Sequence, residues 1–140
     1  MTLSALIFDV DGTLADTEDV HRQAFNAAFA AAGFDWVWGE QMYTQLLACT
    51  GGKARIRFFL EGMHPDILKR DDIDQLIADL HKQKTDYYVA ALKEGRVPLR
   101  PGIERLLREA REQGLTLAIA TTTTPVNLQS LIENTLGAPA

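Results

Sequence analysis

Two aspartates near the start of the chain, Asp9 and Asp11, have the type and spacing to do chemistry together. They follow an apolar run at residues 5–8, which we predict to be a strand buried on both faces. Side chains at positions i and i+2 of an extended segment point the same way, so both carboxylates can face one site. In open α/β folds such a site lies beyond the carboxyl ends of the strands, and Gly12 allows a tight turn there.

Two neighbouring carboxylates repel each other unless a cation binds them or one stays protonated, and both conditions suit phosphoryl transfer. One aspartate can attack phosphorus and form an aspartyl phosphate, while the other serves first as general acid and then as general base. Mg²⁺ is a hard cation that bridges carboxylate and phosphate oxygens. A surface turn is the ordinary alternative. A calcium-binding EF-hand loop is excluded, because Leu14 and Val20 occupy the positions that require Gly and Glu.

The sequence Phe-Asp-Val-Asp-Gly-Thr-Leu at residues 8–14 resembles the first motif of the haloacid dehalogenase superfamily. The resemblance implies that Asp9 is the nucleophile and Asp11 the general acid/base. It also implies that Mg²⁺ binds the Asp9 carboxylate and the Asp11 backbone carbonyl. The function expected from this motif is Mg²⁺-dependent hydrolysis of a phosphoric monoester.

The second motif of that superfamily is a Ser or Thr that ends an apolar strand, and Thr121 fits it after the predicted strand 115–120. Its hydroxyl can donate to a phosphoryl oxygen, as can backbone N–H groups near a helix N-terminus. We therefore expect Thr121, Thr122 and Thr123 to contact the phosphoryl group. Thr124 is better explained as the N-cap of a last helix that starts at Pro125.

The elements that must position these residues alternate between strand and helix. From Asp16 the apolar spacing becomes helical, and residues 39–95 favour helices with no strand. A further helix is expected to start at Pro101 and end at Gly114. The order predicts an α/β fold, a Rossmann-like core with a parallel sheet, truncated here, and an inserted helical cap subdomain. We expect residues 1–15 and 97–140 to form the core and residues 16–96 the cap. The apolar face of the first cap helix is predicted to consist of Val20, Ala24, Ala27, Ala28 and Ala31.

The insertion resembles the helical cap of the subgroup that contains β-phosphoglucomutase, phosphoglycolate phosphatase and the CbbY proteins. Residues 50–55, Thr-Gly-Gly-Lys-Ala-Arg, are most similar to the corresponding segment of CbbY proteins. This resemblance implies a sugar bisphosphate substrate such as xylulose 1,5-bisphosphate. His21 and Tyr43 also fit this pattern, but we give them no site role. The substrate-binding residues implied by the resemblance are Glu18, Gly51, Gly52, Lys53, Arg55, His81 and Lys84.

Physical chemistry supports a second phosphate site in this insertion. Gly51 and Gly52 expose backbone amides at a helix start, and Lys53 and Arg55 add positive charge. A P-loop is excluded, because the earlier glycine and the Ser/Thr after Lys53 are missing and no strand precedes the segment. The alternative to phosphate binding is that the Lys53 and Arg55 side chains lie on a solvated helix face. For Glu18, the alternative is a favourable interaction of its negative charge with the first turn of a helix.

Composition limits the partners of the chain. Its net charge of −5 disfavours nucleic acid, and 46% apolar with 24% charged residues is ordinary for a soluble globular protein. Cys49 is the only cysteine, so no internal disulfide can form. Neither a signal peptide nor a membrane-spanning segment is predicted. We expect a cytoplasmic monomer that acts on a small phosphorylated sugar.

Two other functions remain open on the sequence. One is a phosphomutase similar to β-phosphoglucomutase, and the other is a non-catalytic sugar-phosphate binding fragment. The superfamily has a further lysine motif and an acidic motif downstream of the second, and residues 122–140 offer neither. We therefore expect the chain to be the N-terminal part of a longer protein. On its own it should bind Mg²⁺ weakly and turn over little or no substrate.

Overall fold

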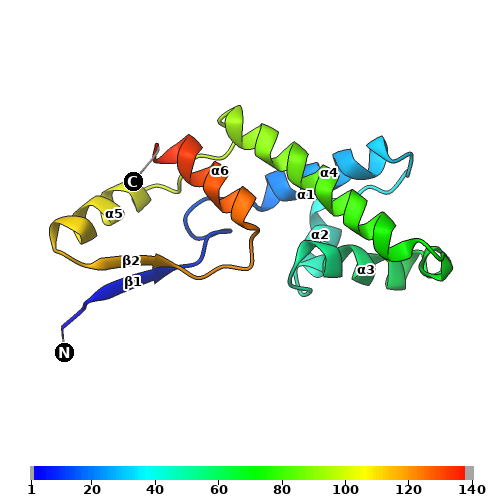
Figure 1. Ribbon diagram of the computed structural model, residues 1–140, viewed down its shortest axis with the longest axis horizontal. Helices are drawn as coiled ribbons and strands as arrows, with labels where there is room; N and C mark the ends of the chain where they lie inside the picture. The colour runs from blue at the N-terminus through cyan, green and yellow to red at the C-terminus, as the bar shows by residue number, and fades with distance from the viewer. Residues whose placement is uncertain (1, 138–140) are drawn as a thin grey trace. The chain divides into compact units, whose positions relative to one another are not determined.

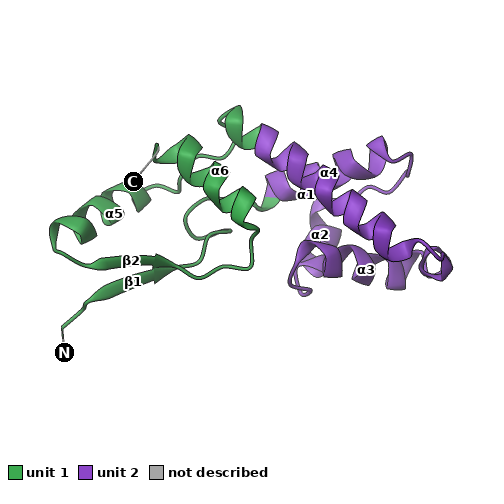
Figure 2. Cartoon of the chain, viewed as in Figure 1, with its two compact units in different colours: residues 1–18, 91–140 green, residues 19–90 purple. Residues whose placement is uncertain are grey.

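The structure is a computed structural model that describes residues 2–137. The chain forms two compact units, coloured separately in Figure 2. The first, unit 1, consists of residues 1–18 and 91–140, and the second, unit 2, of residues 19–90. The chain therefore leaves unit 1 once and returns to it once.

Unit 1 contains a parallel sheet of two strands, β1 (Ala5–Phe8) and β2 (Thr116–Ile119). Ala5 pairs with Thr116 and Phe8 with Ile119, so the carboxyl ends of both strands meet at one edge. The helices α5 (Ile103–Glu112) and α6 (Pro125–Thr135) precede and follow β2 (Figure 1). This arrangement confirms the predicted α/β class and both predicted strands.

The prediction that the strand at residues 5–8 is buried on both faces is wrong for the described chain. Ile7 is 70% exposed and Ile119 is 38% exposed. Phe8, Leu117 and Ile119 line an apolar hollow of about 880 Å³, to which residues of α5 and α6 also contribute. Residues 2–137 provide no layer over the side of the sheet that carries Ile7, and a strand cannot bury a side chain against an absent layer.

Helix α5 does not begin at Pro101 as predicted. Its first residue is Ile103, and its N-cap is Gly102 in the left-handed conformation, with φ 87°. That conformation interrupts a helix and favours glycine, so Pro101 lies in the turn before it. The other N-terminal prediction is confirmed: Thr124 caps α6 by accepting a hydrogen bond from the Asn127 N–H, and Pro125 is the first helical residue.

Unit 2 is helical, as predicted. Its elements are α1 (Glu18–Ala31), α2 (Glu40–Leu46), α3 (Gly52–Met63), the short 3₁₀ helix η1 (Ile67–Lys69) and α4 (Ile73–Lys93). The first residue of α1 and residues 91–93 of α4 belong to unit 1. The core is more aromatic than predicted. Phe25 and Phe29 of α1 are fully buried against Trp38, with ring centroids 4.7 and 4.9 Å from it, whereas Ala31 is exposed.

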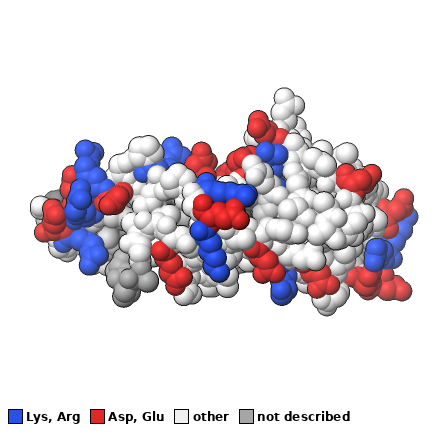
Figure 3. Space-filling model, turned by 90° about the horizontal axis from the view of Figure 1, so that it is seen from above, with Lys and Arg blue, Asp and Glu red and all other residues white. Residues whose placement is uncertain are grey.

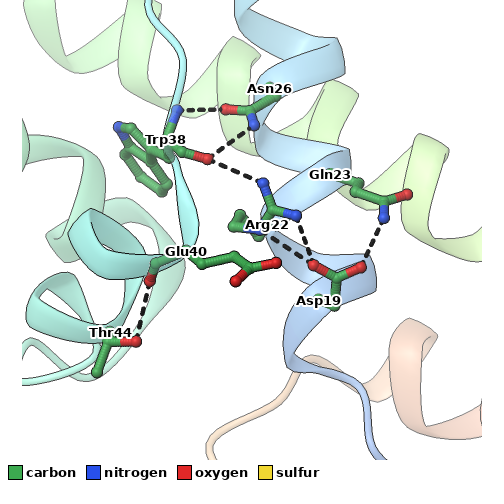
Figure 4. A network of polar contacts seen from close by, with 7 residues as sticks. All are labelled: Asp19, Arg22, Gln23, Asn26, Trp38, Glu40 and Thr44. Atoms are coloured by element: carbon green, nitrogen blue, oxygen red, sulfur yellow. Dashed lines mark hydrogen bonds and ion pairs between the residues drawn. The ribbon is translucent and has the colours of Figure 1, made fainter.

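A polar network fixes the segment between α1 and α2 (Figure 4). The Asn26 amide donates to the Trp38 carbonyl at 3.0 Å, and its oxygen accepts from the Trp38 N–H at 2.7 Å. Arg22 donates to the same carbonyl at 3.1 Å and pairs with Asp19 at 2.6 Å. These contacts satisfy the backbone of Trp38, whose side chain fills the core.

The surface carries both signs of charge. On the face drawn in Figure 3, Lys and Arg side chains lie among Asp and Glu side chains. Among the described residues, none of the helices has the length and apolar content needed to cross a membrane.

Candidate active site

The turn after β1 presents the two aspartates at the carboxyl edge of the sheet. Asp9 is exposed and Asp11 is half-buried, while Val10 between them is buried. The Val10 carbonyl accepts hydrogen bonds from the N–H groups of Thr13 at 3.1 Å and Leu14 at 3.0 Å. A buried apolar residue therefore anchors the turn and leaves the carboxylates on either side outside the core.

A buried hydroxyl holds Asp11. The Oγ1 atom of Thr17 donates to Oδ1 of Asp11 at 2.5 Å, and Thr17 is 0% exposed. Thr17 immediately precedes the first residue of α1, a position where a threonine is ordinarily a helix cap. No feature of the sequence other than this position could have suggested that Thr17 contacts Asp11.

Thr121 follows the neighbouring strand. The Ala120 N–H donates to the Phe8 carbonyl at 2.9 Å, which continues the β1–β2 pairing up to the residue before Thr121. Asp9 and Thr121 thus follow adjacent strands at the same sheet edge. The Thr121 hydroxyl accepts from the Thr123 N–H at 3.1 Å, so this N–H is already used, while Thr122 is exposed.

The donors at this edge fit Mg²⁺ but do not enclose it. Asp9 and Asp11 supply hard oxygen atoms, and Mg²⁺ usually binds one or two carboxylates and keeps several waters. Within residues 2–137, no three side chains among His, Cys, Asp and Glu gather into a metal site. The site therefore suits a hydrated Mg²⁺ ion better than a cation such as Zn²⁺ that requires a full protein ligand set.

Unit 2 contains a buried cationic cluster. Nζ of Lys84 lies 2.8 Å from Nδ1 of His21, and the two residues are 4% and 6% exposed. The His21 ring stacks on Tyr88 at 4.0 Å, and the Lys84 ammonium lies 5.0 Å from the centroid of the Phe25 ring. A charged Lys84 can only donate, so Nδ1 of His21 is then the unprotonated nitrogen.

His81 lies one helical turn before Lys84, against the start of α3. A Cβ atom built on Gly52 would come within 2.5 Å of the Cδ2 and Nε2 atoms of the His81 ring. Burial first, and then the nearby charges of Lys84, Lys53 and His21, together lower the pKa of His81 to about 4. The structure thus brings Gly52 and Lys53 at the start of α3 together with His81 and Lys84 of α4.

The remaining predicted residues have other surroundings. Arg55 donates to the carbonyls of Leu46 at 3.2 Å and Cys49 at 3.1 Å, and so ties α3 to the end of α2. Gly51 caps α3 with φ 92°, a conformation that explains why glycine stands there. Glu18 is half-buried at the first position of α1.

The site combines a turn with two carboxylates at the edge of a parallel sheet and a helical insertion after it. A family of known proteins matches this chain. Residues 3–139 match the model of the haloacid dehalogenase-like hydrolase family. The chain belongs to this family, which confirms the resemblance seen in its first motif.

The most informative similarities are to CbbY proteins. The chain is 52% identical to the plasmid CbbY protein of Cupriavidus necator over 97% of its length, and to CbbY of Rhodobacter capsulatus over its whole length. The crystal structure of Rhodobacter sphaeroides CbbY with phosphate has a TM-score of 0.88, 46% identity and 99% coverage of this chain. An aspartate-to-asparagine mutant of that protein was solved with xylulose 1,5-bisphosphate.

The matches also show a difference in length. The chain spans 54% of the Cupriavidus protein, 60% of the Rhodobacter capsulatus protein and 59% of the Rhodobacter sphaeroides chain.

Proposed function

We propose that this chain carries the nucleophile and the acid/base of a phosphatase that acts on a sugar bisphosphate such as xylulose 1,5-bisphosphate. The observation that supports this most is the turn at residues 9–13, where an exposed Asp9 and a Thr17-bound Asp11 share the edge of the sheet with Thr121. The high identity to CbbY proteins supports the substrate class.

The proposed reaction has two steps. The Asp9 carboxylate attacks phosphorus, the bond between phosphorus and the sugar oxygen breaks, and Asp11 gives that oxygen a proton. Asp11 then takes a proton from water, which attacks phosphorus and releases inorganic phosphate and free Asp9. The Thr121 hydroxyl donates to a phosphoryl oxygen in both steps. When bound by Asp9 and the Asp11 carbonyl, Mg²⁺ neutralises part of the charge that these groups and the phosphate share.

We further propose that unit 1 is part of the hydrolase core and that unit 2 is its cap, with the second phosphate held by unit 2. Gly51 and Gly52 at the start of α3 offer backbone N–H groups, Lys53 and Lys84 offer positive charge, and His81 lies beside them as a neutral ring. The burial of Lys84 strengthens its interaction with an anion, since water screens a buried charge less. The monomeric state and cytoplasmic location remain predictions from the sequence.

Binding of the sugar bisphosphate tests this proposal without requiring turnover. We expect the Asp9→Asn chain to bind xylulose 1,5-bisphosphate in calorimetric titrations, and the added Lys84→Met substitution to weaken binding about tenfold or more. Methionine keeps the buried stem but removes the partner of His21, so urea unfolding of each variant shows whether it is folded before its binding is compared. The matched control is Lys82→Met on the same helix, whose side chain is exposed and pairs with Asp86. Equal binding by both lysine variants would contradict the second phosphate site.

Product analysis separates the phosphatase from the phosphomutase. Release of inorganic phosphate supports hydrolysis, and an isomerised sugar phosphate supports the mutase. The non-catalytic alternative predicts that Asp9→Asn leaves every measured function of the protein unchanged.

A further inference from the structure

The two segments that connect unit 1 to unit 2 contact each other within unit 1. Ala15, in the segment leaving the first turn, forms an antiparallel bridge with Leu99, in the segment that returns after α4. Next to this bridge, the Arg100 N–H donates to the Leu14 carbonyl at 2.9 Å. The returning segment therefore lies along the C-terminal side of the turn that carries the aspartates.

Arg100 also reaches into the turn itself. Its Nη1 atom donates to the Gly12 carbonyl at 2.8 Å, across 88 residues of sequence. The Gly12 N–H donates to the Ala15 carbonyl at 2.8 Å, and Gly12 has φ 76°. Both polar backbone groups of Gly12 are thus bonded, one of them to a cationic donor.

The bonds of Gly12 determine the direction of the Asp11 carbonyl. A peptide unit is planar, so the Gly12 N–H and the Asp11 carbonyl belong to one rigid plane. The hydrogen bond from the Gly12 N–H to the Ala15 carbonyl holds the Asp11–Gly12 peptide unit. The hydrogen bond from Arg100 to the Gly12 carbonyl holds the next peptide unit, Gly12–Thr13. A change at Arg100 can therefore rotate the plane that bears the Asp11 carbonyl.

We propose that Arg100 is a positioning residue that couples the returning segment to the Asp9–Thr13 turn through the Gly12 carbonyl. This inference rests on the proposed function, since it gives the turn a reaction to perform. Arg100 acts on orientation rather than by contact with the phosphoryl group, and small errors in orientation are costly in phosphoryl transfer.

The test compares Arg100→Gln and Arg100→Lys with Arg105→Gln in the full 140-residue chain. Arg105 is a matched control because it is 73% exposed on α5 and pairs with Glu109 within its own helix. Arg100→Gln should slow phosphorylation of Asp9 by xylulose 1,5-bisphosphate about tenfold, and Arg100→Lys should recover part of the rate. The amide NMR signals of Gly12 and Thr13 should shift in Arg100→Gln, while its midpoint of urea unfolding stays that of the control.

Two results would overturn the proposal. One is an Arg100→Gln chain that phosphorylates Asp9 as fast as the control. The other is unchanged amide signals at residues 11–13. Failure of the proposed function looks different, because the unsubstituted chain would then take up no phosphoryl group at all. In that case the NMR comparison still decides whether Arg100 positions the turn.

Discussion

The hydroxyl of Thr17 donates a hydrogen bond of 2.5 Å to the carboxylate of Asp11. Thr17 is fully buried at the entrance to α1, so its hydroxyl has few alternative orientations. The hydrogen bond therefore restrains the orientation of this half-buried carboxylate. The contact links the residue before α1 to the residue that we propose as the general acid/base.

Replacing Thr17 with valine should loosen Asp11 without changing the shape of the side chain. We expect a loss of about 1–3 kcal/mol in unfolding free energy, because the hydrogen bond has a charged acceptor and a buried donor. Phosphorylation of Asp9 should also slow about tenfold, because Asp11 is no longer held in one orientation. Urea unfolding and acid-quenched mass spectrometry measure the two effects.

Thr44→Val is the control, since Thr44 is exposed and its hydroxyl donates to the Glu40 carbonyl of its own helix. Equal effects in both variants would contradict a special role for Thr17.

Replacing Gly52 with alanine should displace His81. The new methyl group would lie 2.5 Å from two atoms of the His81 ring and 3.4 Å from Phe25. We expect a loss of about 1–3 kcal/mol in unfolding free energy from overpacking, and weaker binding of the sugar bisphosphate.

Gly62 provides the matched control on the same helix. A Cβ atom at Gly62 meets nothing within 4 Å, so Gly62→Ala should be neutral or should stabilise the helix by about 0.5–1 kcal/mol. If Gly52→Ala were as stable as Gly62→Ala in urea unfolding, the close approach of α3 and His81 would be wrong.

Stability should depend on pH through His81. The pKa of His81 is about 4 in the folded chain, against an ordinary value of 6.5, so the unfolded chain takes up the proton first as pH falls. The contribution of His81 to stability is therefore complete above pH 6.5 and is lost between about pH 6.5 and 4. His81→Gln should flatten the dependence of the unfolding free energy on pH in that window. A slope that persists in His81→Gln would contradict the burial of this ring.

The sequence predicted elements well where the pattern was local. The apolar runs around β1 and β2, and the Thr124-Pro125 start of α6, depend on neighbouring residues only. It failed where the outcome depends on distant packing. The exposure of Ile7, for example, depends on which layers cover the sheet. The start of α5 is a local failure instead, because the left-handed Gly102 interrupts the helix directly after Pro101.

The same division applies to the candidate site. Asp9, Asp11 and Thr121 could be selected because each follows a strand. The contact between His21 and Lys84 joins residues 63 positions apart, and that between Arg100 and Gly12 joins residues 88 apart. The local sequence does not reveal such pairs. A threonine, arginine or lysine that makes a buried contact stands in the same kind of sequence pattern as one on a solvated surface.

Phosphorylation of Asp9 is the central claim, and it can be measured directly. The 140-residue chain, in excess over xylulose 1,5-bisphosphate and with Mg²⁺ present, is quenched in acid, digested and examined by mass spectrometry. A single transfer is sufficient, so the measurement does not require turnover. We predict one phosphoryl group on the peptide that contains Asp9, and none on that peptide in the Asp9→Asn chain. An Asp9 peptide that stays unmodified, or equal labelling of the Asp9→Asn chain, would contradict the account.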